Sequence, residues 1–232
     1  MPHPRTIYSL LLGAFLLDSG PATAQDIPSS YRFVENSQEG GLFIGTASLN
    51  AGQLGLGPKS ANVFGGRYSV MFGSAVAFEG DATVFKGERD VIDIRRSEDD
   101  RVLGQSTIDF VAIDARLRLN LTGHRTWRGL QPFIAFGGGM ALGSSMERTL
   151  EDEADMPLPD QYDFGSKFLA TLSGGTNLHL SSRFMLRLDG VMNLWKISTP
   201  TGWLTTDADL GAIPEDEWVS ARNLSIGASW RF

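Results

Sequence analysis

The most regular pattern of polar and apolar positions lies in residues 223–232, where the two kinds of side chain alternate one by one. A period of two places alternate side chains on opposite faces, as in a β-strand whose two faces meet different surroundings. One face of this segment is polar or small and ends in Arg231. The other face is apolar and consists of Leu224, Ile226, Ala228, Trp230 and Phe232.

The same alternation recurs along the chain and predicts eight strands. They cover residues 40–50, 61–72, 76–87, 105–121, 130–142, 166–180, 184–196 and 220–232. Some connections between them are short, namely 73–75, 122–129 and 181–183. The others are 51–60, which is of modest length, and 88–104, 143–165 and 197–219, which are long and polar. Short turns at one end and long loops at the other are typical of an up-and-down barrel of antiparallel strands.

The register of the second and third strands follows from a hairpin around residues 73–75. Folding there pairs apolar or small residues on one face: Phe72 with Val76, Val70 with Phe78, Tyr68 with Gly80, Gly66 with Ala82, and Phe64 with Val84. On the other face the same register places Arg67 opposite Asp81 and Ser69 opposite Glu79. Two independent criteria, apolar matching and charge matching, therefore choose one register.

The beginning of the chain resembles a secretory signal peptide. Arg5 precedes an apolar run at residues 7–17, and Ala22 and Ala24 form a small-x-small cleavage pattern. An apolar run of this length is too short for the roughly 20 residues of a membrane-spanning helix. We expect residues 1–24 to be a signal peptide, residues 25–39 a periplasmic N-terminal segment, and residues 40–232 a barrel.

Composition narrows the class of protein further. The chain has no cysteine, which excludes disulfides and thiol chemistry. Its 27 glycines exceed the usual share and suit a curved sheet better than helices. A formal net charge of −7 argues against a nucleic-acid partner, since phosphate backbones require clustered Lys and Arg.

The final strand ending in Phe232, the apparent leader and the one-sided loops together resemble small bacterial outer-membrane β-barrels of the OmpA, OmpX and OmpW type. The resemblance implies an all-β, eight-stranded antiparallel up-and-down transmembrane β-barrel in the bacterial outer membrane of a Gram-negative-type envelope, with both termini periplasmic. It implies contact with outer-membrane lipid and lipopolysaccharide, recognition of Phe232 by the barrel-assembly machinery, and a structural or surface-interaction role. We also expect a monomer.

Alternation alone fits either a soluble barrel with an apolar interior or a membrane barrel with an apolar exterior. Three features favour the membrane: the terminal Phe232, the one-sided loops, and aromatic residues near one rim, namely Phe72, Trp127, Phe184, Trp230 and Phe232.

Given lipid outside, we expect every strand charge to lie on the inner face, because a lipid-exposed Arg or Lys at mid-bilayer costs roughly 2–4 kcal/mol. The expected inner network is Arg67, Glu79, Asp81, Asp114, Arg116, Arg118, Arg187 and Asp189. Eight strands leave an interior just wide enough for side chains to fill. Four arginines and four acids can neutralise one another there, so we expect a plugged lumen and a structural role for these residues.

The sequence offers a few candidates for catalytic or metal-binding residues, and each lacks a feature that the chemistry requires. His179, Leu180 and Ser181 match the His-x-Ser element of barrel deacylases, but no glutamate follows on the next strand to orient the histidine. Glu79 and Asp81 could form an acid and base pair, yet the opposing arginines keep both ionised. The acidic loops at 147–163 and 207–217 match no cation-binding spacing. We therefore predict no enzyme, no catalytic residue, no cofactor and no metal, and keep a narrow solute channel and an outer-leaflet lipid enzyme as alternatives.

Overall fold

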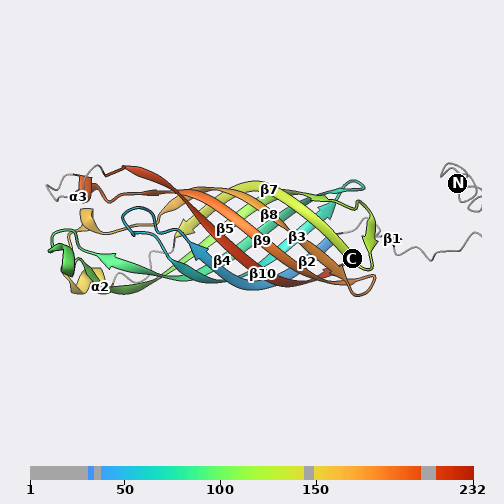
Figure 1. The fold of residues 1–232 in the computed structure, drawn as a ribbon, viewed down its shortest axis with the longest axis horizontal. Helices are drawn as coiled ribbons and strands as arrows, with labels where there is room; N and C mark the ends of the chain where they lie inside the picture. The colour runs from blue at the N-terminus through green and yellow to red at the C-terminus, as the bar shows by residue number, and fades with distance from the viewer. Residues whose placement is uncertain (1–30, 34–37, 144–148, 205–212) are drawn as a thin grey trace, which may run out of the picture.

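Eight antiparallel strands close into a ring and form an elongated barrel (Figure 1). The computed structural model describes residues 31–33, 38–143, 149–204 and 213–232. The ring consists of β2 (Gln38–Leu49), β3 (Ser60–Met71), β4 (Val76–Ile92), β5 (Val102–Asn120), β7 (Leu130–Gly143), β8 (Ser166–His179), β9 (Phe184–Ser198) and β10 (Asp216–Arg231). Each strand pairs with its neighbour along the chain, and β10 pairs with β2 to close the ring. This confirms the predicted all-β, eight-stranded architecture.

The predicted hairpin register between β3 and β4 is confirmed. Arg67 lies opposite Asp81, Ser69 opposite Glu79, and Tyr68 opposite Gly80. The amide of Phe72 donates to the carbonyl of Val76 across the turn, at 3.2 Å. Apolar matching and charge matching thus selected the pairing that the chain adopts.

Two short strands outside the ring were not predicted. β1 (Tyr31–Phe33) pairs with β6 (Arg125–Trp127), which lies in the connection between β5 and β7. This places β1 within the stretch predicted as an N-terminal segment, while β2 begins at Gln38, two residues before the predicted boundary. Residues 1–24, the predicted signal peptide, lie outside the described residues.

In the part of the chain that the structure describes, helical structure lies at the loop end of the barrel. It consists of α2 (Thr149–Glu153), α3 (Thr201–Leu204) and 3₁₀ turns at Glu98–Asp100 and Leu158–Asp160. Among the described residues, no helix combines the length and the apolar character needed to span a bilayer.

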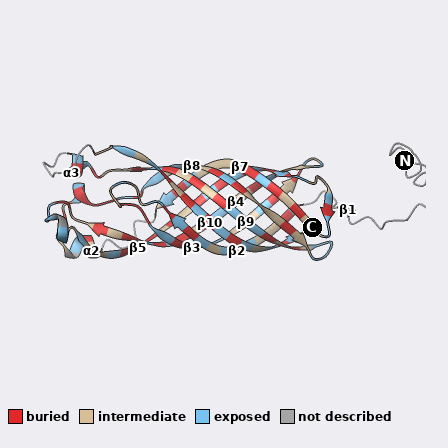
Figure 2. Cartoon of the chain, in the orientation of Figure 1, coloured by how far each residue is buried: buried red, intermediate tan, exposed pale blue. Residues whose placement is uncertain are grey.

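The outer face of the wall changes from apolar to polar along the barrel axis. Beyond Gln38 at the rim, the outward residues of β2 to β5 near the short turns are apolar, aromatic or small, up to a row in which Ile44, Phe64, Val84 and Val111 pair side by side. The next outward row is polar and consists of Thr46, Asn62, Lys86 and Asp109. Figure 2 shows the alternation of buried and exposed positions along each strand.

The expectation that all strand charges face inward is therefore wrong for the loop end. Lys86, Asp109, Lys196 and Arg222 all have outward positions and are exposed or half-buried. Lys86 and Asp109 lie beyond the last apolar row, in a row of polar side chains. The prediction failed because it treated the whole length of each strand as facing one environment.

The interior changes in the opposite sense. At the loop end it is filled by what we call the aromatic half, a buried cluster that includes Phe85, Phe110, Phe164, Trp195 and Trp203. The Phe110 ring stacks on Phe85 and Phe164 with centroid distances of 4.5 and 4.7 Å, and meets the edge of Trp195 at 5.9 Å. Rings from the β4–β5 hairpin, the loop before β8, and β9 therefore pack together across the barrel mouth.

Loop residues close over the aromatic half. Trp203 of α3 is buried, and its Nε1 donates to the carbonyl of Asp160 at 3.1 Å. Arg89 pairs with Glu151 of α2, and its guanidinium lies 5.3 Å from the Tyr162 ring. Burial raises the pKa of the Tyr162 phenol above its usual value. Trp203 thus packs into the barrel mouth.

Candidate functional site

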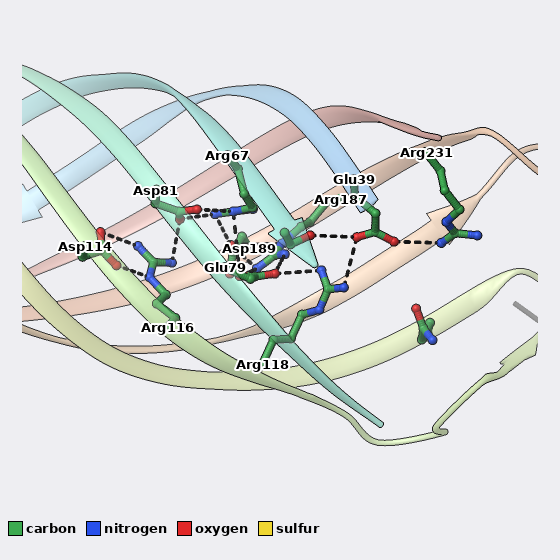
Figure 3. A network of polar contacts seen from close by, with 12 residues as sticks. Glu39, Arg67, Glu79, Asp81, Asp114, Arg116, Arg118, Arg187, Asp189 and Arg231 are labelled. Carbon is green, nitrogen blue, oxygen red and sulfur yellow. Dashed lines mark hydrogen bonds and ion pairs between the residues drawn. The ribbon is translucent and has the colours of Figure 1, made fainter. Parts of the chain in front are cut away.

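The eight charged residues predicted for the lumen converge in the half of the interior near the short turns (Figure 3). They come from β3, β4, β5 and β9, and all eight side chains are buried. Two further residues, Glu39 of β2 and Arg231 of β10, join the same network. We call these ten residues the charged half: Glu39, Arg67, Glu79, Asp81, Asp114, Arg116, Arg118, Arg187, Asp189 and Arg231.

Glu79 lies at the centre of the charged half. Its Oε1 accepts from Arg187 Nη1 at 2.6 Å and from Arg118 Nη1 at 2.7 Å, and its Oε2 accepts from Arg187 Nη2 at 3.2 Å. A third arginine, Arg67, approaches within 3.9 Å. One carboxylate thus ties together three arginines from three strands, which offsets the cost of burying its charge.

Arg67 and Arg116 hold the remaining acids together. Arg67 grips Asp81 with two hydrogen bonds of 2.7 and 2.8 Å and also donates to Asp189 at 2.8 Å. Asp81 and Asp114 lie directly opposite each other in the β4–β5 register, an arrangement that by itself is repulsive. Arg116 relieves it, because it hydrogen-bonds to Asp114 and places its Nη1 3.1 Å from Asp81.

The branch through Glu39 was not predicted. Glu39 accepts from Arg118 at 3.0 Å, from Arg231 at 2.9 Å and from the hydroxyl of Ser69 at 3.1 Å. Arg231 has the inward parity of the polar face of its strand, so its position was available in the sequence pattern. Glu39 was missed because it precedes the predicted start of the first strand by one residue. With this pair, the network holds five arginines and five acids, the four predicted of each plus one.

Two inward phenylalanines lie beneath the arginines. The Arg187 guanidinium stacks 3.9 Å from the centroid of Phe133, and that of Arg67 lies 5.0 Å from Phe43. An added Cβ at Gly175 would come within 2.8 Å of Phe133 Cζ, so the missing side chain there leaves room for the ring. Gly175 therefore makes room for Arg187 by way of the ring on which that guanidinium stacks.

The His-x-Ser element forms no catalytic arrangement in the described structure. His179 Nε2 lies 3.1 Å from Gln131 Oε1, and its Nδ1 lies 3.3 Å from a nitrogen of Arg231. The Ser181 hydroxyl accepts from the backbone amide of Phe184 at 2.9 Å, within the turn before β9. The His179 ring therefore contacts the amide of Gln131 and the guanidinium of Arg231, and the Ser181 hydroxyl stabilises the turn before β9.

The described residues contain no cluster of three or more His, Cys, Asp or Glu side chains that could hold a metal ion. Several acids of the long loops instead pair with arginines, as Asp160 does with Arg95 at 2.7 Å. Loop residues 147–148 and 207–212 lie outside the described ranges.

An eight-stranded ring with polar groups inside and an apolar band outside defines the fold class of the small outer-membrane β-barrels. The outer membrane protein OprG from Pseudomonas aeruginosa has a similar fold, with a TM-score of 0.53 and 14% identity over 86% of this chain and 98% of OprG.

Lower similarity is found to Neisserial surface protein A, with a TM-score of 0.47 and 12% identity over 88% of this chain and 98% of that protein. The attachment invasion locus protein Ail of Yersinia pestis gives a TM-score of 0.41 and 12% identity over 85% of this chain and all of Ail. No protein-family model and no curated protein matches the sequence. The comparison with OprG supports the fold and assigns no activity.

Proposed function

We propose that the protein is an integral outer-membrane barrel with a closed lumen, which serves a structural or surface-interaction role. The observation that carries this proposal is the reversal of polarity along the wall. On β2 to β5 the outward positions up to the row of Ile44, Phe64, Val84 and Val111 are mostly apolar or small and the interior behind them is charged, whereas the next outward row is polar and the core behind it is aromatic.

The size of the apolar band fits a bilayer. On β4 the outward apolar or small positions run from Val76 to Val84, and on β5 from Val111 to Leu119. Each stretch covers nine residues, and a tilted transmembrane strand needs about 9–11. A soluble barrel has no reason to expose such a band, since Leu42, Ile44 and Ile113 are each more than half exposed.

The closed lumen is supported by both halves of the interior. Ion pairs between arginines and acids cross the charged half, and packed rings fill the aromatic half above it. A solute path would need to pass both. The contacts of His179 and Ser181 favour a protein without catalytic activity, so we propose no enzymatic role.

The proposed orientation places the short turns in the periplasm and the long loops outside the cell. The first and last ring strands then meet at the periplasmic rim, where Gln38 and Phe232 exchange backbone hydrogen bonds of 3.1 and 3.3 Å. Phe232 is exposed there and lies near Tyr68, in keeping with the rim of a membrane band. We propose outer-membrane lipid and lipopolysaccharide as its surroundings and a monomeric state. The proposed use of Phe232 by the assembly machinery stays a prediction.

Membrane fractionation followed by electrophoresis of unheated and boiled samples tests the placement. We expect the protein in the outer-membrane fraction and a different mobility after boiling, since a folded barrel resists detergent. Recovery as a soluble periplasmic protein would contradict the proposal.

Planar-bilayer recording tests the closed lumen. We expect no conductance steps from the wild-type protein. Conductance that disappears in Arg116→Ala or Arg187→Ala would instead support the narrow channel, and lipid deacylation lost in His179→Ala would support the enzyme.

A further inference from the structure

A recess lies on the outer wall at the level where the apolar band ends. It is formed over β2, β3, β4 and β5 and has a volume of about 510 Å³, which is within the usual range for small-ligand sites. Its polar lining includes Thr46, Ser60, Asn62, Lys86, Thr107 and Asp109.

The position of the recess is set by the strand register. The lining residues Thr46, Asn62, Lys86 and Asp109 form one row across four strands. The row directly below is the last apolar one and contains Phe64 and Val84. Under the proposed placement, the recess therefore opens at the boundary between hydrocarbon and headgroups, on the side of the long loops.

Lys86 is suited to hold a phosphate at this boundary. Its ammonium lies over the ring of Phe64, 5.8 Å from the centroid, so the cation lies where the last apolar row meets the polar row. Among the described residues Lys86 makes no ion pair, although Lys59 and Lys196 each do. Its register partner on β5 is Asp109, and no ion pair joins the two in the described structure, so the charge of Lys86 is available to a ligand.

The rest of the lining favours a headgroup with hydroxyl groups. Asn62, Thr46 and Ser60 offer amide and hydroxyl groups on the exposed wall, and Asp109 and Glu88 offer carboxylates that accept from donors. A phosphate with no hydrogen-bond donors beside it would be repelled by the carboxylates of Asp109 and Glu88. A phosphorylated sugar satisfies both the cation and the acceptors.

We infer that the recess between the outward row of β2 to β5 and the loop end binds the phosphorylated sugar headgroup of an outer-leaflet lipid, with Lys86 on the phosphate and Asn62 on the sugar. The inference rests on the proposed outer-membrane placement and adds to it a defined lipid site. Acyl chains of such a lipid would lie along the apolar band directly below the recess.

The test uses the folded full-length mature protein in detergent micelles, with bound lipid measured by native mass spectrometry. The probes are diphosphoryl lipid A, phosphatidylethanolamine, phosphatidylglycerol and a phosphorylated glucosamine disaccharide without acyl chains. We expect lipid A to bind in preference to both phospholipids, and the soluble disaccharide to compete only weakly. Lys86→Ala and Asn62→Ala should each weaken lipid A binding, Lys86→Ala by about tenfold.

Lys196→Ala is the matched control. Lys196 is also an outward lysine beside an aromatic ring, 5.7 Å from Trp218, but it lies on β9, four strands from β4 in either direction around the ring. It should leave lipid A binding unchanged.

Each contrary outcome has its own meaning. Equal losses in Lys86→Ala and Lys196→Ala, or no loss in either, would overturn the site. Equal binding of a phospholipid would overturn the sugar assignment, and equal binding of the soluble disaccharide would overturn the lipid assignment. If the variants and the wild type all lack the mobility change on boiling, the proposed placement itself fails. Normal barrel behaviour with unaltered lipid A binding overturns only the inference.

Discussion

The charged half and the aromatic half of the interior occupy the same barrel and the same strands, yet they are stabilised by different forces. In the charged half, Glu79 and its arginines are buried and held by short hydrogen bonds. In the aromatic half, Phe110 and Trp195 are held by burial and ring packing. The outer wall differs in the opposite direction, with apolar side chains around the charged half and Lys86 and Asp109 around the aromatic half.

The difference shows that the type of residue at each strand position depends on the surroundings of both faces of the barrel wall. Under the proposed membrane placement, lipid covers the apolar band, and the interior behind that band must then be filled by polar groups that neutralise one another. Where water covers the outside, the interior can follow the ordinary rule and be apolar. Along β4, the polarity of the inward and outward faces thus reverses, and the reversal falls between Val84 and Lys86.

The largest expected effect comes from breaking the centre of the charged half. Glu79→Leu leaves Arg118 and Arg187 without their shared partner, and removal of one member of a buried ion pair costs about 5 kcal/mol at the upper end. We expect a lower midpoint of urea unfolding in lipid vesicles. The folded fraction at each urea concentration is measured by the mobility difference between unheated and boiled samples.

Glu88→Leu is the control for this variant, because Glu88 lies on the same strand but is outward and exposed. Adding Arg187→Met to Glu79→Leu should recover part of the loss, since it removes one of the unpaired charges. An unfolding midpoint for Glu79→Leu equal to that of the wild type would show that the network does not stabilise the barrel.

The second effect comes from the aromatic half. Phe110→Ala removes a ring that contacts Phe85, Phe164 and Trp195, and the loss of burial together with the cavity costs about 3 kcal/mol. Val111→Ala, at the neighbouring outward position, should cost less. If both substitutions lower the free energy of unfolding equally, the aromatic half is not the packed core that its ring contacts describe.

These two halves differed in how far the sequence could predict them. Arg67 and Asp81 were paired correctly because parity and charge both restrict the register, and each criterion removes alternatives left by the other. The composition of the charged half followed from the same parity on β5 and β9. Its branch through Glu39 did not, because the alternation does not show where a strand begins to within one residue.

The aromatic half was missed for a different reason. Phe85 and Phe110 have inward parity, but their outward neighbours Val84 and Val111 are also apolar. The polar and apolar alternation is therefore lost where the polarity of the two faces reverses. The outward charges of Lys86 and Asp109 were the available signal of a change in surroundings. Trp203 could not be placed at all, since its contact with Asp160 joins two loops and depends on tertiary structure alone.

A third prediction concerns the wall and uses the depth of the outward positions. Ala115 is the middle one of the outward apolar positions of β5, and Val111 is the last one before the polar row. An arginine facing lipid costs roughly 2–4 kcal/mol at mid-bilayer and about 0–1 kcal/mol near the interface. Ala115→Arg should therefore destabilise the barrel in vesicles several times more than Val111→Arg does. Equal costs at the two depths would mean that the band is not covered by hydrocarbon.

The smallest expected effect separates the loops from the barrel. Trp203→Phe keeps an aromatic ring in the aromatic half but removes the hydrogen bond from Nε1 to the carbonyl of Asp160, a loss of about 1 kcal/mol. Because this bond joins the loop before β8 to the loop before β10, we expect faster hydrogen exchange in residues 158–164, with the exchange of β4 and β9 in the charged half unchanged. Trp218→Phe is the control, since Trp218 is exposed and packs against Lys196 on the outer wall. Faster exchange throughout the barrel would show that the two halves unfold as one unit, and equal exchange in both variants would show that Trp203 does not hold the loops over the core.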